Sequence, residues 1–196
     1  MSKSLIVLSA PSGAGKTTVA RHLLQVFPML RFSVSATTRP KRRGEVDKKD
    51  YHFLSRDEFK RRIEQGDLIE YEEIFGNYYG TLKSVVQESL TRREFILFDV
   101  DVKGALSLRT AFPNDSLLIF VAPPDMQTLA ERLRNRRTET EEQIQMRLAR
   151  AEMEMGHIDA FDHVLVNSVL NQTLESAETI VQKNIAGSGE QQQLEL

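Results

Sequence analysis

Residues 5–17 read Leu5-Ile6-Val7-Leu8-Ser9-Ala10-Pro11-Ser12-Gly13-Ala14-Gly15-Lys16-Thr17, and this stretch decides the fold. A short apolar run enters a turn rich in small residues, and apolar residues at helical spacing then continue to Phe27. Residues 10–17 match the phosphate-binding pattern Gly-x-x-x-x-Gly-Lys-Ser/Thr, except that Ala10 stands at the first glycine. We therefore predict a buried strand, a phosphate-binding loop and a helix, in that order.

The loop supplies the chemical groups that hold a nucleoside triphosphate. Backbone N–H groups can turn inward around a phosphate at Gly13 and Gly15, a helix N-terminus lies behind them, and Lys16 adds an ammonium group. Thr17 offers a hydroxyl to Mg²⁺. The predicted ATP-binding residues of this loop are Ser12, Gly13, Ala14, Gly15, Lys16, Thr17 and Thr18. The alternative, a glycine-rich turn with a chance lysine, does not account for the flanking strand and helix. The loop alone does not distinguish a kinase from a GTPase or a motor.

Composition limits the other functions that are open to the chain. A length of 196 residues with 40% hydrophobic residues fits one globular α/β domain, and a net charge of −2 gives no reason to expect a nucleic-acid binder. The chain has no cysteine, which excludes disulfides, thiolate metal sites and a thiol nucleophile. No apolar run is long enough for a signal peptide or a membrane span. We expect a cytoplasmic protein with no membrane partner.

Further along the chain, apolar runs alternate with helical patterns. The runs at 95–98 and 117–121 are typical of parallel strands buried on both faces, and Val102 to Phe112 reads as the crossover helix between them. Other expected strands are Phe32 to Ser35, Leu68 to Phe75 and Val164 to Val166. Two helix starts carry the capping-box form, Ser55 with Glu58 and Thr140 with Gln143. The pattern predicts an α/β fold.

The polar segment from Thr37 to Asp50 is predicted to be a surface loop. It carries several arginines within a few residues, and the guanidinium fork suits phosphate recognition. By composition alone, the segment could equally be a solvated loop or a basic targeting run.

At this point several separated motifs resemble the guanylate kinase family, in the family's order along the chain. They are Ser35 to Val46, Asp50-Tyr51-His52-Phe53, Gly76-Asn77-Tyr78-Tyr79-Gly80-Thr81, Asp99-Val100-Asp101, Ala122-Pro123-Pro124, Arg136 to Glu142 and Val164-Leu165-Val166-Asn167. The resemblance runs from about Ser4 to Ile185. The chain departs from the family at Arg137, where a glycine usually follows the lid arginine.

The resemblance implies a doubly wound parallel-sheet core of the P-loop type with two inserts, all in a single domain over residues 1–186. The core would comprise 1–32, 84–124 and 156–186, the GMP-binding insert 33–83, and the lid 125–155. Residues 187–196 are expected to be a disordered tail.

The resemblance also assigns roles within the site. The phosphate of GMP would be held by Arg39, Arg42, Tyr51 and Tyr79, and the guanine edge would be read by Glu70, Ser35 and Asp101. Glu45 and Thr81 would complete the pocket, with Asp99 near the GMP and the metal, and Asn167 near the adenine or its ribose. The cations around the transferring phosphoryl group would be Lys16, Arg132, Arg136 and Arg147.

The activity implied by the resemblance is the Mg²⁺-dependent transfer of the γ-phosphoryl group of ATP to GMP or dGMP. The expected partners are these small molecules and not a nucleic acid. Two alternatives remain open: a nucleoside monophosphate kinase of another base preference, and a non-enzymatic guanylate-kinase-like interaction domain. A GTPase is disfavoured because the chain lacks the Asn-Lys-x-Asp signature that reads guanine in that class.

Overall fold

The computed structural model describes residues 3–74, 76–135 and 140–186. Its centre is a five-stranded parallel sheet in the spatial order β2-β7-β1-β8-β9. The strands are β1 (Leu5–Ser9), β2 (Leu30–Phe32), β7 (Phe95–Asp99), β8 (Ser116–Ala122) and β9 (His163–Val166). The parallel strands predicted at 95–98 and 117–121 are thereby confirmed, since both pair directly with β1.

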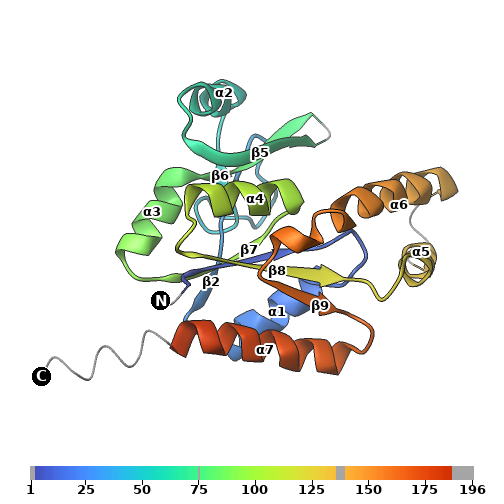
Figure 1. The fold of residues 1–196 in the computed structure, drawn as a ribbon. Coiled ribbons are helices and arrows are strands. Elements are labelled where there is room, and N and C mark those ends of the chain that lie inside the picture. Colours follow the sequence, from blue (N-terminus) through green and yellow to red (C-terminus); the bar gives the residue numbers. More distant parts are fainter. Residues whose placement is uncertain (1–2, 75, 136–139, 187–196) are drawn as a thin grey trace, which may run out of the picture.

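Helices cover both faces of this sheet (Figure 1). One face carries α1 (Lys16–Val26) and α7 (Leu170–Ala186), and the other carries α3 (Lys83–Thr91) and α4 (Val102–Ala111). Successive residues of β1 alternate between the two cores: Ile6 and Leu8 pack toward α1, whereas Leu5 and Val7 pack toward α4. A strand with this alternation is apolar throughout because both of its faces are buried. The doubly wound α/β fold is confirmed.

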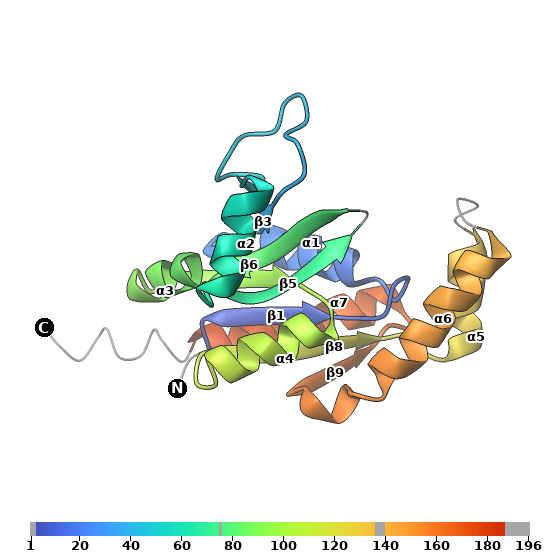
Figure 2. The ribbon, with the colours of Figure 1, turned by 90° about the horizontal axis from the view of Figure 1, so that it is seen from above.

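A second sheet of four strands has the order β4-β3-β6-β5; Figure 1 shows its strand β5 above α4, and in the view from above β5 and β6 lie over the core (Figure 2). It consists of β3 (Ala36–Thr37), β4 (His52–Phe53), β5 (Leu68–Ile74) and β6 (Asn77–Leu82), with α2 (Arg56–Glu64) beside it. Ser55 caps α2 by accepting a hydrogen bond from the backbone N–H of Glu58 at 3.1 Å.

The strand predicted at Phe32 to Ser35 is wrong in its bounds. The central sheet's strand ends at Phe32, and the chain then leaves the central sheet and joins the second sheet at Ala36. Residues 30–37 contribute one strand to each sheet, so the local pattern of apolar residues could not show where the chain passes from one sheet to the other. Between β3 and β4 the predicted surface loop is present, with an isolated bridge from Asp47 to Tyr51.

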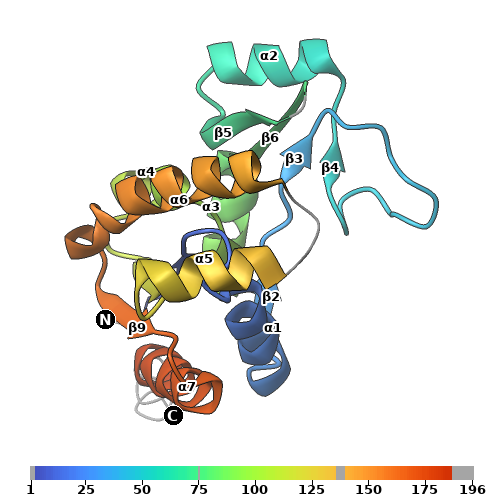
Figure 3. The same cartoon turned by 90° about the vertical axis from the view of Figure 1, so that its right-hand side faces the viewer.

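Two helices, α5 (Met126–Asn135) and α6 (Glu141–Met155), pack against each other beyond the end of the central sheet (Figure 3). Leu129 and Leu133 of α5 meet Ile144 and Ala151 of α6 in a small apolar core. The capping box predicted at Thr140 is confirmed in both of its hydrogen bonds. A short 3-10 turn (Ile158–Ala160) follows α6 and leads to β9. Within the described ranges, none of the helices has the length and apolar character needed to span a bilayer.

Candidate active site

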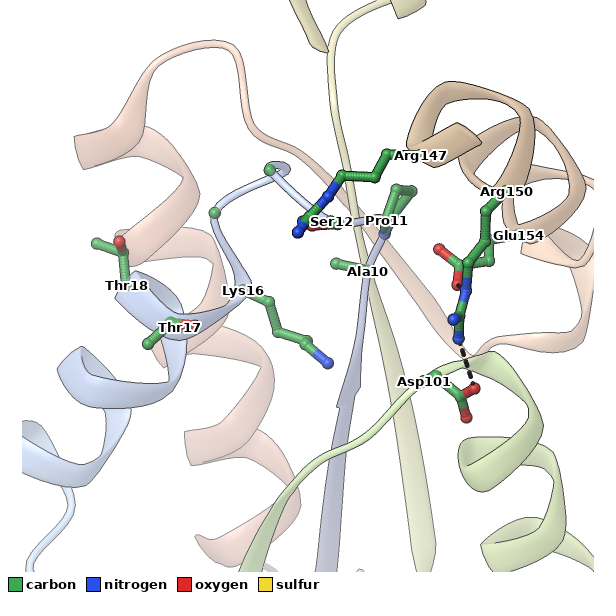
Figure 4. Close-up of a pocket in the computed structure, with 12 residues that line it drawn as sticks. Ala10, Pro11, Ser12, Lys16, Thr17, Thr18, Asp101, Arg147, Arg150 and Glu154 are labelled. Atoms are coloured by element: carbon green, nitrogen blue, oxygen red, sulfur yellow. Dashed lines mark hydrogen bonds and ion pairs between the residues drawn. The ribbon is translucent and has the colours of Figure 1, made fainter. Parts of the chain in front are cut away.

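The phosphate loop connects β1 to α1 with a backbone shape that depends on glycine. Gly13 and Gly15 have φ angles of 96° and 103°, in the left-handed region that L side chains rarely adopt. Gly15 is the N-cap of α1, so the first free N–H groups of the helix open toward the loop. The loop lines a cavity of about 560 Å³ together with Asp101, Arg147, Arg150 and Glu154 (Figure 4).

Lys16 begins α1 and turns its ammonium group toward the end of β7. Its Nζ lies 2.5 Å from Asp99 Oδ1 and donates a hydrogen bond to the carbonyl of Val100 at 2.7 Å. Asp99 reaches this place because β7 pairs in parallel with β1 and sets Asp99 opposite Leu8. Lys16 is thus largely buried, with 19% of its side chain exposed.

Asn167 follows β9 and lies under the phosphate loop. Its side chain is buried and donates from Nδ2 to the carbonyl of Ala14 at 2.8 Å. A Cβ atom added to Gly15 would lie 2.3 Å from that Nδ2, so glycine is also required here for space. Arg132 of α5 donates to the Asn167 carbonyl at 2.8 Å. Asn167 therefore supports the loop backbone, and its contact with the adenine or its ribose stays a prediction.

Helix α6 brings one predicted arginine directly to the loop. Arg147 Nη1 donates to the Ser12 hydroxyl at 2.5 Å, across 135 residues of sequence. Arg136, another of the three arginines predicted for the lid, and Arg137 both lie outside the described residues. The predicted loop residues Thr17 and Thr18 are exposed and line the same cavity.

The second sheet gathers an arginine and two tyrosines. Arg39 forms a two-pronged ion pair with Glu45 at 2.6 and 3.0 Å, and Glu45 also accepts from the Arg42 backbone N–H at 2.7 Å. The Arg39 hydrogen bonds hold the pKa of Glu45 below its usual value. The Arg39 guanidinium stands 5.3 Å from the ring centre of Tyr51, whose ring meets Tyr79 edge-on at 6.2 Å.

Glu70 and Thr81 form a polar pair in the second sheet, in which Thr81 is buried and Glu70 is half-buried. They face each other across the β5–β6 pairing, and the Thr81 hydroxyl donates to Glu70 Oε1 at 2.6 Å. Burial raises the pKa of the Glu70 carboxyl, and the nearby charges of Asp101 and Glu72 raise it further. Asp101 caps α4 by accepting from the Gly104 N–H at 2.8 Å. Ser35, just before β3, is half-buried, and its carbonyl accepts from the His52 N–H at 2.9 Å.

The predicted residues thus fall into three groups: the loop with Lys16 and Asp99, the Glu70 group, and the Arg39 group. Asp101 belongs to two of them, since it lines the loop cavity and acts on Glu70. Sequence reasoning missed Gly104, Arg150 and Glu154. Helical spacing offered one signal, because Arg150 lies three positions after Arg147 and so shares its face of α6.

Comparison with known proteins identifies relatives over nearly the whole chain. The family model described as guanylate kinase matches residues 2–184. The guanylate kinase of Chlorobium luteolum is 51% identical over 172 residues, which cover 88% of this chain and 87% of that protein. The guanylate kinase of Chlorobaculum tepidum is 49% identical over 175 residues, or 89% and 90% of the two chains. The crystal structure of guanylate kinase from Anaplasma phagocytophilum superposes with a TM-score of 0.68 at 33% identity, covering 93% of this chain and 86% of that one.

Proposed function

The chain belongs to the guanylate kinase family, and we propose that it is an enzyme that transfers the γ-phosphoryl group of ATP to GMP or dGMP. The observation that carries this proposal is the hydrogen-bonded pair of half-buried Glu70 and buried Thr81 beside Asp101, next to an intact phosphate loop. A carboxylate at Glu70 can accept from both N1–H and the exocyclic amino group of guanine. Adenine has an unprotonated N1 at the corresponding place and offers that carboxylate no donor there.

On the acceptor side, Glu70, Ser35, Thr81 and Asp101 read the base, while Arg39, Arg42, Tyr51 and Tyr79 hold the phosphate. The support for Arg39 is its aromatic surround and its pairing with Glu45, which together hold the guanidinium in one orientation. Glu45 then acts on GMP through Arg39. A phosphate dianion competes for the same guanidinium by forming two parallel hydrogen bonds of its own.

On the donor side, residues 12–18 hold the phosphates of ATP through the backbone N–H groups of the loop and the N-terminus of α1. Thr17 and Asp99 suit Mg²⁺ as hard oxygen donors, since Thr17 lines the loop cavity and Asp99 contacts Lys16, which lines it too. When bound, Mg²⁺ neutralises charge on the phosphate oxygens. Asn167 binds the Ala14 carbonyl and so keeps that one carbonyl turned away from those phosphates.

The transfer needs alignment and positive charge rather than covalent participation by the protein, because the transition state is loose and its charge spreads over the equatorial oxygens. Lys16 and Arg147 supply that charge from the loop and from α6, and Arg132 joins them from α5. Arg136 has the same proposed role, although it lies outside the described residues.

We further propose that residues 1–186 form one domain whose insert (33–83) and lid (125–155) close over the core when both nucleotides are bound. Water is a competing acceptor, so the cations should align only around bound GMP. The cytoplasm, where ATP is abundant, is the proposed location.

A coupled assay of ADP release with GMP, dGMP, AMP, CMP and UMP tests the proposed activity. Turnover with GMP and negligible turnover with AMP is the expected result. Comparable turnover with AMP would favour a monophosphate kinase of another base preference, and no turnover with any acceptor would favour a non-enzymatic interaction domain.

A further inference from the structure

Arg150 of α6 contacts carboxylates outside its own helix. Its Nη2 donates to Asp101 Oδ2 at 3.0 Å, and its Nη1 lies 3.6 Å from Glu72 Oε1 of β5. Its Nε donates to Glu154 Oε1, one turn along α6, at 2.9 Å. One guanidinium therefore links α6 to Asp101 at the start of α4, as Figure 4 shows, and also to Glu72 of β5.

Arg150 shares a face of α6 with Arg147, which reaches the Ser12 hydroxyl of the phosphate loop. The contacts of Arg150 with Asp101 and Glu72 therefore also set the position of α6 along its axis, and its rotation about that axis, at Arg147. The two contacts point to different halves of the site. Arg147 points to the donor loop, and Arg150 points to the carboxylates of the acceptor side.

The surroundings of Arg150 do not suit direct binding of a polyphosphate. Its three nitrogens each face a different carboxylate, from Glu154, Glu72 and Asp101, so the positive charge is already compensated. Both carboxylate oxygens of Asp101 accept one hydrogen bond, Oδ1 from the Gly104 N–H and Oδ2 from Arg150. Each carboxylate oxygen keeps a second lone pair, so Asp101 can accept from a base while Arg150 stays bound.

We propose that Arg150 is a positioning residue that ties α6 to Asp101 and Glu72, and thereby presents Arg147 to the phosphate loop in register with the acceptor site. This inference rests on the proposed function for its effect on catalysis, but not for its effect on the position of α6. The ion pairs are half-exposed, with 50% of the Arg150 side chain accessible. Such pairs are individually weak, which suits a link that must form and release in every cycle.

Distance measurement by electron spin resonance tests the link in the full-length, ligand-free protein. The chain has no cysteine, so a double variant with Met146→Cys on α6 and Lys60→Cys on α2 carries spin labels at these two positions and nowhere else. Both side chains are exposed. We expect a single narrow distance distribution in the parent and a broader, longer one in Arg150→Met.

Two further variants separate position from charge. Arg134→Met is the matched control, because it also removes a lid guanidinium and an ion pair, the one with Glu141, but has no described contact with the core or insert. It should keep the parent distribution. Glu72→Gln should give part of the Arg150→Met broadening.

Kinetics then separate positioning from direct binding. Arg150→Met should lower kcat about tenfold with the KM for ATP within about twofold of the parent, and Arg150→Lys should recover part of kcat. An unchanged distance distribution in folded Arg150→Met overturns the proposal, and so does a large rise in the KM for ATP, which means direct phosphate binding. If the parent itself does not phosphorylate GMP, the proposed function fails, while the distance measurement still decides the link.

Discussion

Lys16 Nζ and Asp99 Oδ1 lie 2.5 Å apart, and this pair joins the start of α1 to the end of β7. The lysine proposed to bind phosphate is therefore held by a carboxylate and by the Val100 carbonyl. An ammonium group has three N–H donors, so Lys16 can donate to a phosphate oxygen as well as to these partners. The pair keeps the Lys16 ammonium group beside the phosphate loop.

Lys16→Met should abolish nearly all phosphoryl transfer. Removing a preorganised cation at the reacting phosphate costs about 10² to 10³ in kcat. The protein should remain folded, since Asp99 is 21% exposed and keeps access to water when its partner is lost. Steady-state kinetics and thermal unfolding check both points. Lys3→Met is the control, because Lys3 lies just before the first residue of β1 and the phosphate loop follows the last one. Activity of Lys16→Met within tenfold of the parent would contradict the proposed role of Lys16.

Glu70→Gln should raise the KM for GMP by about tenfold to a hundredfold, the effect of losing about 1.5 to 3 kcal/mol of charged hydrogen bonding. The KM for ATP should stay unchanged, because ATP binds the loop and not the second sheet. Glu73→Gln on the same strand is the control, since its exposed carboxylate pairs with Arg56. Equal GMP kinetics in Glu70→Gln and the parent would remove Glu70 from base recognition.

The raised pKa of Glu70 predicts a pH dependence in both binding and stability. Only the ionised carboxylate accepts both guanine donors, so the KM for GMP should rise as the pH falls through a value above the ordinary 4.5. The folded state holds this proton more tightly than the unfolded state. Its contribution to stability is therefore present below pH 4.5 and is lost as the pH rises through the folded pKa.

Denaturant titrations of the parent and Glu70→Gln at several pH values check the sign of the stability effect. The variant should gain stability relative to the parent as the pH rises above 4.5, and the gain should level off once Glu70 is ionised. A gain that grows as the pH falls would mean that Glu70 is ionised and paired in the folded protein.

Asn167→Ala should destabilise the phosphate loop by removing the side chain that binds its backbone. The buried Ala14 carbonyl loses its donor, which costs about 1 to 3 kcal/mol of unfolding free energy. Asn167→Asp should be worse, because it faces that carbonyl with a carboxylate. Both changes should raise the KM for ATP, whereas the exposed Asn171→Ala should alter neither quantity. An Asn167→Ala protein with normal stability and a raised KM for ATP would favour the direct adenine contact instead.

Gly104→Ala should impair acceptor binding without replacing any proposed ligand. An added Cβ would lie 3.1 Å from Val100 Cβ, so Val100 must give way slightly, and it would press at 3.4 Å on both Glu70 Cγ and Asp101 Oδ1, two groups proposed to read the base. We expect the KM for GMP to rise about tenfold, or roughly 1.4 kcal/mol, with the KM for ATP unchanged. The greater helix propensity of alanine offsets part of the crowding in the unfolding free energy. Thr110→Ala near the far end of α4 is the control, and equal effects of the two changes would rule out the proposed pressure on Glu70 and Asp101.

The sequence by itself determined the strand, loop and helix at residues 5–26 and the buried strands at 95–98 and 117–121. These depend on short-range rules: apolar periodicity, glycine at positive φ, and capping side chains that bond within one turn. It also predicted Lys16, Arg147 and Glu70 as site residues, through a pattern and a resemblance rather than through geometry. Local pattern could not separate β2 from β3, because the chain changes sheets within a few residues.

Only the tertiary structure decided which of these groups meet. Lys16 finds Asp99 because β1 and β7 pair in parallel, and Asn167 finds Ala14 across 153 residues because β9 ends beside the phosphate loop. Arg150 and Gly104 carry no motif, and they matter only through the neighbours that packing gives them. Hydrogen bonds and charge pairs act over a few ångströms, so their partners follow from the way the elements pack and not from the order of residues along the chain.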